Sequence, residues 1–194
     1  MKQLNNYLWL SQISLVLFLV ICTSIIPSVA AKNGGVSNFG NHSSTIILYI
    51  LGFSLCIIFL YLASRVVLKL DSNLQWQSIC LVVLAFLYFL VLISTFPRHI
   101  SFTYSDIHDY LGIVLFIYQF FLSIWLLRKN HNLTLVLFFC IESGGSIVGL
   151  MSILKVVDLL YVGQMIGGLG FGLVFVIAFP EYIETSLNSR TNLS

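Results

Sequence analysis

The chain has 194 residues, of which 59% are hydrophobic and only 8% are charged, and its formal net charge is +2. Average soluble domains carry about 25% charged residues. A soluble core of this size could not cover so much apolar surface, so the composition excludes an ordinary water-soluble globular protein. The small net charge gives no support to a nucleic-acid partner.

Apolar blocks follow one another along the chain, separated by short polar segments. The six blocks cover residues 8–30, 45–68, 77–95, 108–127, 133–154 and 160–179. A helix needs about 20 residues to cross about 30 Å of hydrocarbon. The pattern therefore predicts an all-α, polytopic integral membrane protein. We expect one domain over residues 1–180, a six-helix transmembrane bundle, followed by a mobile cytoplasmic tail at 181–194.

The first block has a second interpretation as a secretory signal peptide. Lys2 gives it a positive start, and Ser28-Val29-Ala30-Ala31 is a plausible small-residue cleavage site. The apolar stretch from Leu8 to Ile26 is longer than the about 7–15 apolar residues of a signal peptide. This length favours a permanent span, with cleavage as the alternative.

The basic residues predict the orientation of the bundle. Six of the nine lie in segments on the same side as the N-terminus: Lys2, Arg65, Lys69, Arg128, Lys129 and Arg190. The other three lie on the opposite side: Lys32, Arg98 and Lys155. Because cytoplasmic loops are enriched in Lys and Arg, we expect both termini in the cytoplasm and the protein in the plasma membrane.

Polar residues gather in two segments on the predicted outer side. They form a candidate outer polar site that contains Ser37, Asn38, Arg98, His108 and Asp109. Because both segments are tethered between neighbouring spans of a small bundle, we expect them to meet. Three interpretations stay open, which are helix capping with interfacial ion pairing, a ligand-binding rim, and catalysis or metal binding. No metal-ligand spacing is present, so we expect no metal and no cofactor.

An acidic residue, Glu142, lies well inside the fifth block, about 13 Å from its inner end. An ionised carboxylate is costly at that depth, so we expect Glu142 to face the bundle interior and to have a polar partner or a proton. Ser146 follows one turn later, and Gln164 lies in the sixth block nearer the outer side. These three residues form a candidate intramembrane site, either a structural hydrogen bond or a proton relay or ligand anchor.

Glycines concentrate in the last two blocks. Three pairs have a spacing of four, which places both members on one helix face: Gly145 and Gly149, Gly163 and Gly167, and Gly168 and Gly172. Small residues at this spacing allow a neighbouring backbone to approach closely. The pairs indicate tight packing between the fifth and sixth spans, and the alternative is a flexible or dimerising surface.

Several short motifs resemble those of a known family. Ser37-Asn38-Phe39-Gly40 resembles the Ser-Asp-Leu-Gly signature of a six-span prokaryotic membrane family of unknown function, although Asn38 replaces the signature's Asp. Phe96-Pro97 at the end of the third block and His108 at the start of the fourth stand where that family has the same residues. The wider superfamily resembles the damage-regulated autophagy modulator proteins. The resemblance implies a fold and a location, and no activity.

Two classes of function fit the sequence. The first is a non-enzymatic membrane protein that binds membrane lipid, a small hydrophobic ligand or a partner subunit. The second is a membrane-embedded enzyme or a small-solute or proton-coupled carrier that uses the outer polar site and Glu142. Intramembrane enzymes and proton-coupled carriers usually have several buried ionisable residues, and one intramembrane Glu is thin support. The sequence therefore favours the first class.

Overall fold

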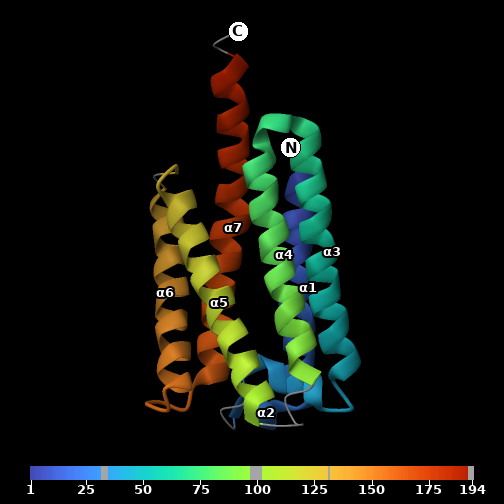
Figure 1. The fold of residues 1–194 in the computed structure, drawn as a ribbon. Helices are drawn as coiled ribbons and strands as arrows, with labels where there is room; N and C mark the ends of the chain where they lie inside the picture. Colours follow the sequence, from blue (N-terminus) through green and yellow to red (C-terminus); the bar gives the residue numbers. More distant parts are fainter. Residues whose placement is uncertain (32–34, 97–101, 131, 192–194) are drawn as a thin grey trace.

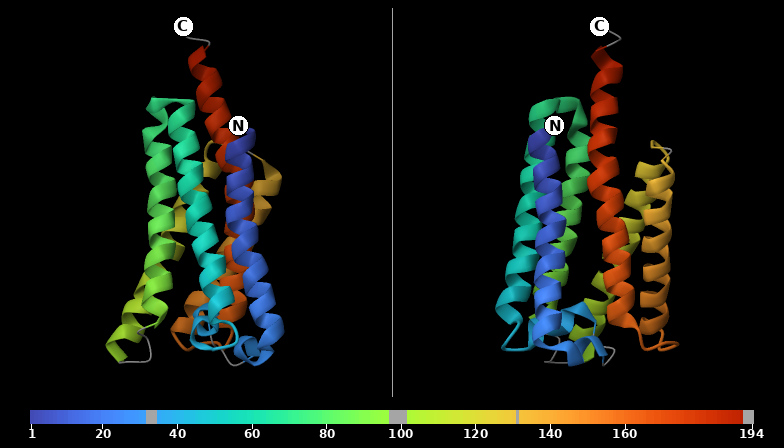
Figure 2. Two further views of the ribbon diagram at one scale, coloured as in Figure 1. Left: turned by 90° about the vertical axis from the view of Figure 1, so that its right-hand side faces the viewer. Right: turned by 180° about the vertical axis from the view of Figure 1, so that it is seen from behind.

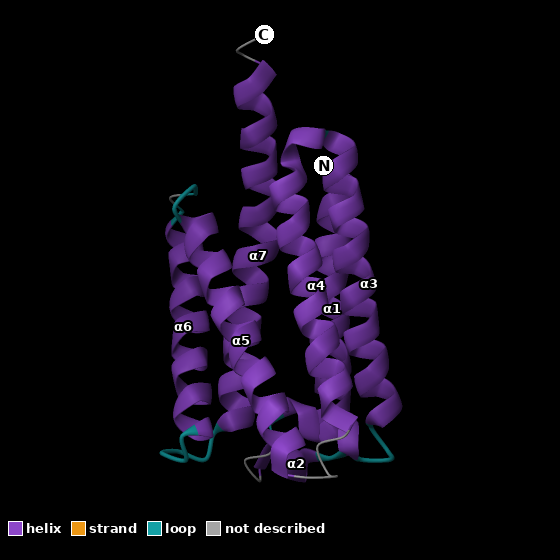
Figure 3. Cartoon of the chain, viewed as in Figure 1, coloured by secondary structure: helices purple, strands orange, loops and turns teal. Residues whose placement is uncertain are grey.

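The computed structural model describes residues 1–31, 35–96, 102–130 and 132–191 (Figure 1). Within these ranges every regular element is a helix (Figure 3). Six helices are long and apolar enough to cross a membrane: α1 (Lys2–Ile25), α3 (Ile46–Leu70), α4 (Gln75–Thr95), α5 (Phe102–Leu127), α6 (Leu133–Ile153) and α7 (Leu160–Thr191). The predicted all-α bundle of six spans is confirmed, and the chain is an integral membrane protein.

Successive spans run in opposite directions, so the N-terminus and the end of α7 lie at the same end of the bundle (Figures 1 and 2). The short helix α2 (Pro27–Ala31) and the 3-10 helix η1 (Val36–Asn41) lie at the opposite end, which we call the η1 end. A second 3-10 helix, η2 (Ser72–Leu74), joins α3 to α4. Polar groups at the η1 end therefore come from segments that are far apart in the sequence.

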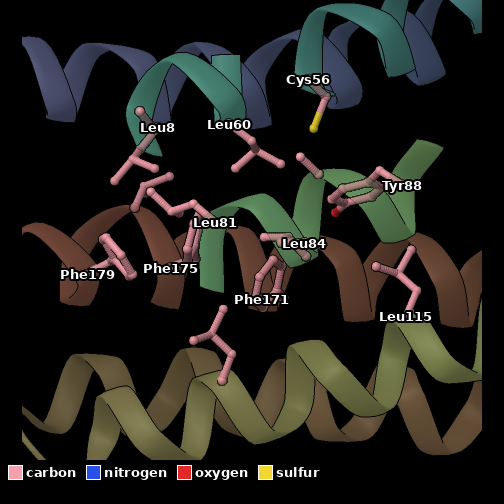
Figure 4. Packing of buried hydrophobic residues seen from close by; sticks show 14 of the residues in the cluster. Leu8, Cys56, Leu60, Leu81, Leu84, Tyr88, Leu115, Phe171, Phe175 and Phe179 are labelled. Atoms are coloured by element: carbon pink, nitrogen blue, oxygen red, sulfur yellow. The ribbon is translucent and has the colours of Figure 1, made fainter. Parts of the chain in front are cut away.

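α7 supplies the aromatic centre of the core. Its Phe171, Phe175 and Phe179 are fully buried. Figure 4 shows these rings facing Leu81 and Leu84 of α4. Long apolar side chains on one face of α7 thus hold the α1, α3 and α4 spans against the rest of the bundle.

Another face of α7 packs against α6, and this contact depends on glycine. A Cβ added to Gly145 would lie 2.1 Å from the nitrogen of Gly167, and one added to Gly163 would lie 2.4 Å from the nitrogen of Gly149. Such distances leave no room for a side chain, so the two backbones touch. Gly170 belongs to the same contact, because its Cβ would lie 2.3 Å from the nitrogen of Glu142.

Two of the predicted packing glycines lie elsewhere. A Cβ on Gly168 would meet nothing within 4 Å, and one on Gly172 would meet only the side chain of Gln12 on α1. Both residues are on the face of α7 turned away from α6. The spacing of four placed them correctly on one helix face, but it could not say which neighbour that face meets.

Three helices have bounds that differ clearly from the predicted blocks. α1 runs over Lys2–Ile25 instead of 8–30, and Pro27–Ala31 forms the separate helix α2. α5 begins at Phe102, so His108 and Asp109 lie in its second turn rather than at its start. α7 continues through Pro180 to Thr191, so most of the segment expected to be a mobile tail is helical. Tertiary contacts account for the continuation. Ile183 is fully buried, the Tyr182 ring lies 4.5 Å from that of Trp125, and Gln77 Nε2 donates to the Tyr182 hydroxyl at 3.3 Å.

Candidate functional site

A cavity of about 110 Å³ lies inside the bundle, extending from η1 toward the middle of the spans. Its walls come from α1, α3, α4, α5, α7 and η1. Most of the lining is apolar, but each of these elements also contributes at least one polar side chain: Gln12, Ser37, Tyr49, Tyr88, His108, Gln119 and Gln164. Among the described residues that line it there is no Lys, Arg, Asp or Glu. The cavity thus offers hydrogen-bonding groups in an apolar surround.

His108 is held in place by α4. Its Nδ1 lies 2.8 Å from the Ser94 hydroxyl oxygen, and that hydroxyl donates to the Val91 carbonyl at 3.0 Å. Because a hydroxyl has a single proton to donate, this arrangement makes Nδ1 of His108 the donor to Ser94. The imidazole is only 5% exposed. The bond fixes the ring against α4, where it lines the cavity.

Gln164 connects α7 to η1. Its side-chain oxygen accepts the Val36 N–H at 2.7 Å, at the start of η1. The neighbouring Gly35 lies against the same side chain, since a Cβ there would lie 2.8 Å from Gln164 Oε1. Gln164 Nε2 makes no hydrogen bond within the described ranges and lines the cavity. The residue therefore positions η1 and leaves an amide donor for a ligand.

The floor of the cavity is a pair of neutral side chains from α4 and α5. Gln119 Nε2 donates to the Tyr88 hydroxyl at 2.7 Å, and both residues are almost fully buried. Gln12 on α1 similarly uses its Nε2 to contact the Ser11 hydroxyl at 3.2 Å. In each glutamine the side-chain oxygen makes no hydrogen bond within the part of the chain that the structure describes. The oxygen of Gln119 is therefore an available acceptor at the cavity floor, and the oxygen of Gln12 is another that lies beside Gly172 of α7.

The structure brings together part of the predicted outer polar site. Ser37 and His108 both line the cavity. Asn38 and Asp109 are half-buried at the same end of the bundle but do not line it. Arg98 lies outside the described residues.

The structure brings together two of the three residues of the predicted intramembrane site. Ser146 and Gln164 both line an apolar groove between α5, α6 and α7, and Gln164 also lines the cavity. The Ser146 hydroxyl lies beside Gly167. Glu142 lies deeper, toward the end of the bundle that holds the termini, and does not line the cavity. Ser146, one turn later on the same helix, makes no hydrogen bond with it in the described residues.

Glu142 instead faces α5. It is 1% exposed, and its carboxyl group lies beside the Ser123 hydroxyl. The contact does not have hydrogen-bond geometry, so both carboxyl oxygens and Ser123 Oγ are buried without a hydrogen bond in the described residues. The hydroxyls of Ser64, Ser94 and Ser143 donate to carbonyls of their own helices, whereas that of Ser123 does not. Ser123 is thus the polar neighbour of Glu142 that the sequence did not indicate.

The sequence reasoning missed four polar cavity residues, Gln12, Tyr49, Tyr88 and Gln119. A signal was present, because a glutamine in the middle of an apolar span is uncommon and usually faces the bundle interior. The described residues contain no group of three or more His, Cys, Asp or Glu that could hold a metal ion. No family model, no curated protein and no solved structure matches the chain.

Proposed function

We propose that the protein is a non-enzymatic membrane protein that binds a small amphipathic ligand, such as a membrane lipid, in the cavity at the η1 end. The observation that carries the proposal is the convergence of Ser37, His108, Gln119 and Gln164 on one apolar-walled cavity. Binding sites typically combine apolar walls with a few polar groups that fix orientation. The volume of about 110 Å³ suits a headgroup or another small polar moiety, not a large solute.

The proposal includes a location and an orientation. We place the protein in the plasma membrane with both termini in the cytoplasm, because of the distribution of Lys and Arg between the two ends. The cavity would then open toward the outer leaflet. We also propose that the chain is related to the six-span family of unknown function, and through it to the damage-regulated autophagy modulators. This relationship does not identify a ligand.

Gly112 offers a direct test of the cavity. It lines the cavity, and a Cβ at this position would meet nothing within 4 Å, so Gly112→Leu fills the space without a backbone clash. The matched control is Gly144→Leu on α6. A Cβ at Gly144 would also meet nothing within 4 Å, and this residue does not line the cavity. Purified protein would be titrated with monoacylglycerols, lysophospholipids and fatty acids while thermal unfolding is followed.

A ligand that binds the folded protein raises its melting temperature. We expect at least one of these amphiphiles to stabilise the parent and Gly144→Leu, and not Gly112→Leu. Equal stabilisation of all three proteins would place binding outside the cavity. No stabilisation of the parent by any of the amphiphiles would refute the proposed function.

A second candidate function is a proton-coupled carrier, favoured by the buried Glu142 carboxyl beside Ser123. Such carriers use intramembrane acids as proton-binding groups. Reconstituted protein would then move protons together with a solute, and Glu142→Gln would abolish this coupling. Because Glu142 does not line the cavity, binding in the cavity would survive the same substitution.

A further inference from the structure

An apolar groove runs along the outside of the bundle between α1 and α7. It has a volume of about 360 Å³, and its walls include Trp9, Ile13 and Leu17 of α1 and Leu173 and Val176 of α7. It follows α1 from Val20 to Trp9, a distance of about 16 Å at 1.5 Å per residue. In a membrane this groove faces the acyl chains.

The groove adjoins the cavity. Gln12 and Val16 of α1 and Gly168 and Leu169 of α7 line both spaces. No side chain closes the connection at Gly168, because a Cβ there would meet nothing within 4 Å. A molecule in the cavity can therefore extend sideways, between α1 and α7, into the region of the membrane chains.

The two spaces together have the polarity of a lipid molecule. Polar side chains surround the cavity near η1, whereas the groove is apolar apart from Gln12, where it meets the cavity, and the indole N–H of Trp9 at its far end. The groove then leads away from η1 toward Trp9 and Val176. A lipid that enters from the η1 end has the same direction, with its headgroup near that surface and its chain extending through the bilayer middle toward the other end of the bundle.

The described lining of the cavity favours an uncharged headgroup. A buried phosphate or carboxylate is most stable beside Lys or Arg, and the described residues that line the two spaces include neither, with His108 as the basic side chain among them. The same described residues include no Asp or Glu for an ammonium group. The side-chain groups that can hydrogen-bond to a ligand are the Gln164 amide nitrogen, a donor, and the side-chain oxygens of Gln12 and Gln119, which are acceptors. These groups match hydroxyl and ester oxygens.

We propose that the ligand is a single-chain lipid with an uncharged, hydroxyl-bearing headgroup, which occupies the cavity while its chain lies in the α1–α7 groove. This inference rests on the proposed function, since it identifies the class of ligand and its path. A monoacylglycerol has these properties. One chain fits one groove, and the glycerol hydroxyls and the ester provide both donors and acceptors.

The test compares headgroups on one chain and then obstructs the groove. The purified protein is titrated with 1-monooleoylglycerol, oleoyl lysophosphatidic acid and oleoyl lysophosphatidylcholine, and binding is measured by thermal shift and native mass spectrometry. Ile13→Trp and Leu173→Trp fill the groove without touching the cavity lining. Ile147→Trp is the control, because Ile147 is 58% exposed on α6 and lines neither space.

We expect the parent to bind one 1-monooleoylglycerol and to prefer it over both charged lipids by at least about fivefold, equivalent to about 1 kcal/mol. Ile13→Trp and Leu173→Trp should weaken its binding by a similar factor, and Ile147→Trp should not. Equal binding of the charged lipids, or groove variants that bind as the parent does, would overturn this inference and leave the proposed function standing. Failure of every amphiphile to bind would overturn both.

Discussion

Gly145 and Gly167 lie in backbone contact, since a Cβ on Gly145 would lie 2.1 Å from the nitrogen of Gly167. The contact repeats toward the η1 end at Gly163 and Gly149, and toward the other end at Gly170 and Glu142. It has a consequence for the cavity. Because α6 is packed directly on one face of α7, the face of α7 that carries Gly168 is turned toward α1, and Gln164, at the border of the α6 contact, reaches η1.

The first prediction concerns two adjacent glycines of α6. Gly145→Ala should destabilise the protein by at least about 1–3 kcal/mol, because even a methyl group must push the two backbones apart. Gly144→Ala should be harmless, since a Cβ there would meet nothing within 4 Å. Thermal unfolding in detergent would measure both. Equal melting temperatures would show that α6 and α7 do not pack as described.

The second prediction concerns Glu142, whose carboxyl oxygens make no hydrogen bond in the described residues. Glu142→Gln keeps the shape and is uncharged, so the stability should change by less than about 1 kcal/mol. Glu142→Lys buries a longer, charged side chain without a partner and should cost more than about 3 kcal/mol. The control is Glu184→Lys, because Glu184 is exposed. If Glu142→Gln were as damaging as Glu142→Lys, the carboxylate would have an essential partner.

The third prediction concerns the extension of α7 beyond Pro180. Tyr182→Ala removes the ring contact with Trp125 and the hydrogen bond from Gln77, and should cost about 1–3 kcal/mol. Tyr182→Phe removes only the hydrogen bond and should cost about 0.5–1.5 kcal/mol. Thermal unfolding would again be the measurement, with the exposed Thr185→Ala as control. A freely mobile tail would make all three variants equal to the parent.

The fourth prediction concerns orientation. A fluorescent reporter that matures only in the cytoplasm should be active when fused after Ser194, and a reporter that works only outside should be inactive there. The reason is the excess of Lys and Arg at the end of the bundle that holds the termini. An insertion of the outside reporter at the exposed Ser43, in the loop between η1 and α3, is the control. The reverse pattern would place the cavity at the cytoplasmic side.

Much of the fold could be predicted because a membrane constrains a sequence strongly. Spans must be apolar and about 20 residues long, so the hydrophobic blocks locate the helices to within a few residues. The ends of α5 and α7 were harder to predict. Hydropathy marks where a helix enters the membrane, whereas α7 continues to Thr191 because Tyr182 and Ile183 find partners on other helices.

The candidate site could be predicted only in part. Ser37 and His108 were grouped because their segments are tethered at one end of the bundle. Gln164 was grouped with Ser146, and both line the groove between α5, α6 and α7, but its place in the cavity was not predicted, because sequence gives its approximate depth but not the helix face that η1 meets. Ser123 carried no signal, since a serine in an apolar span usually bonds to its own helix. The faces of Gly168 and Gly172 likewise depended on where α1 packs.

The central claim is that the cavity at the η1 end holds the polar part of an amphiphile. A 1-monoacylglycerol analogue with a photoreactive group beside its headgroup tests it most directly, with labelled peptides identified by mass spectrometry. We predict adducts on η1, on α5 around His108 and on α7 around Gln164, and we predict their loss in Gly112→Leu. Adducts spread over the membrane-facing surfaces of α4 and α6, and unchanged in Gly112→Leu, would contradict it.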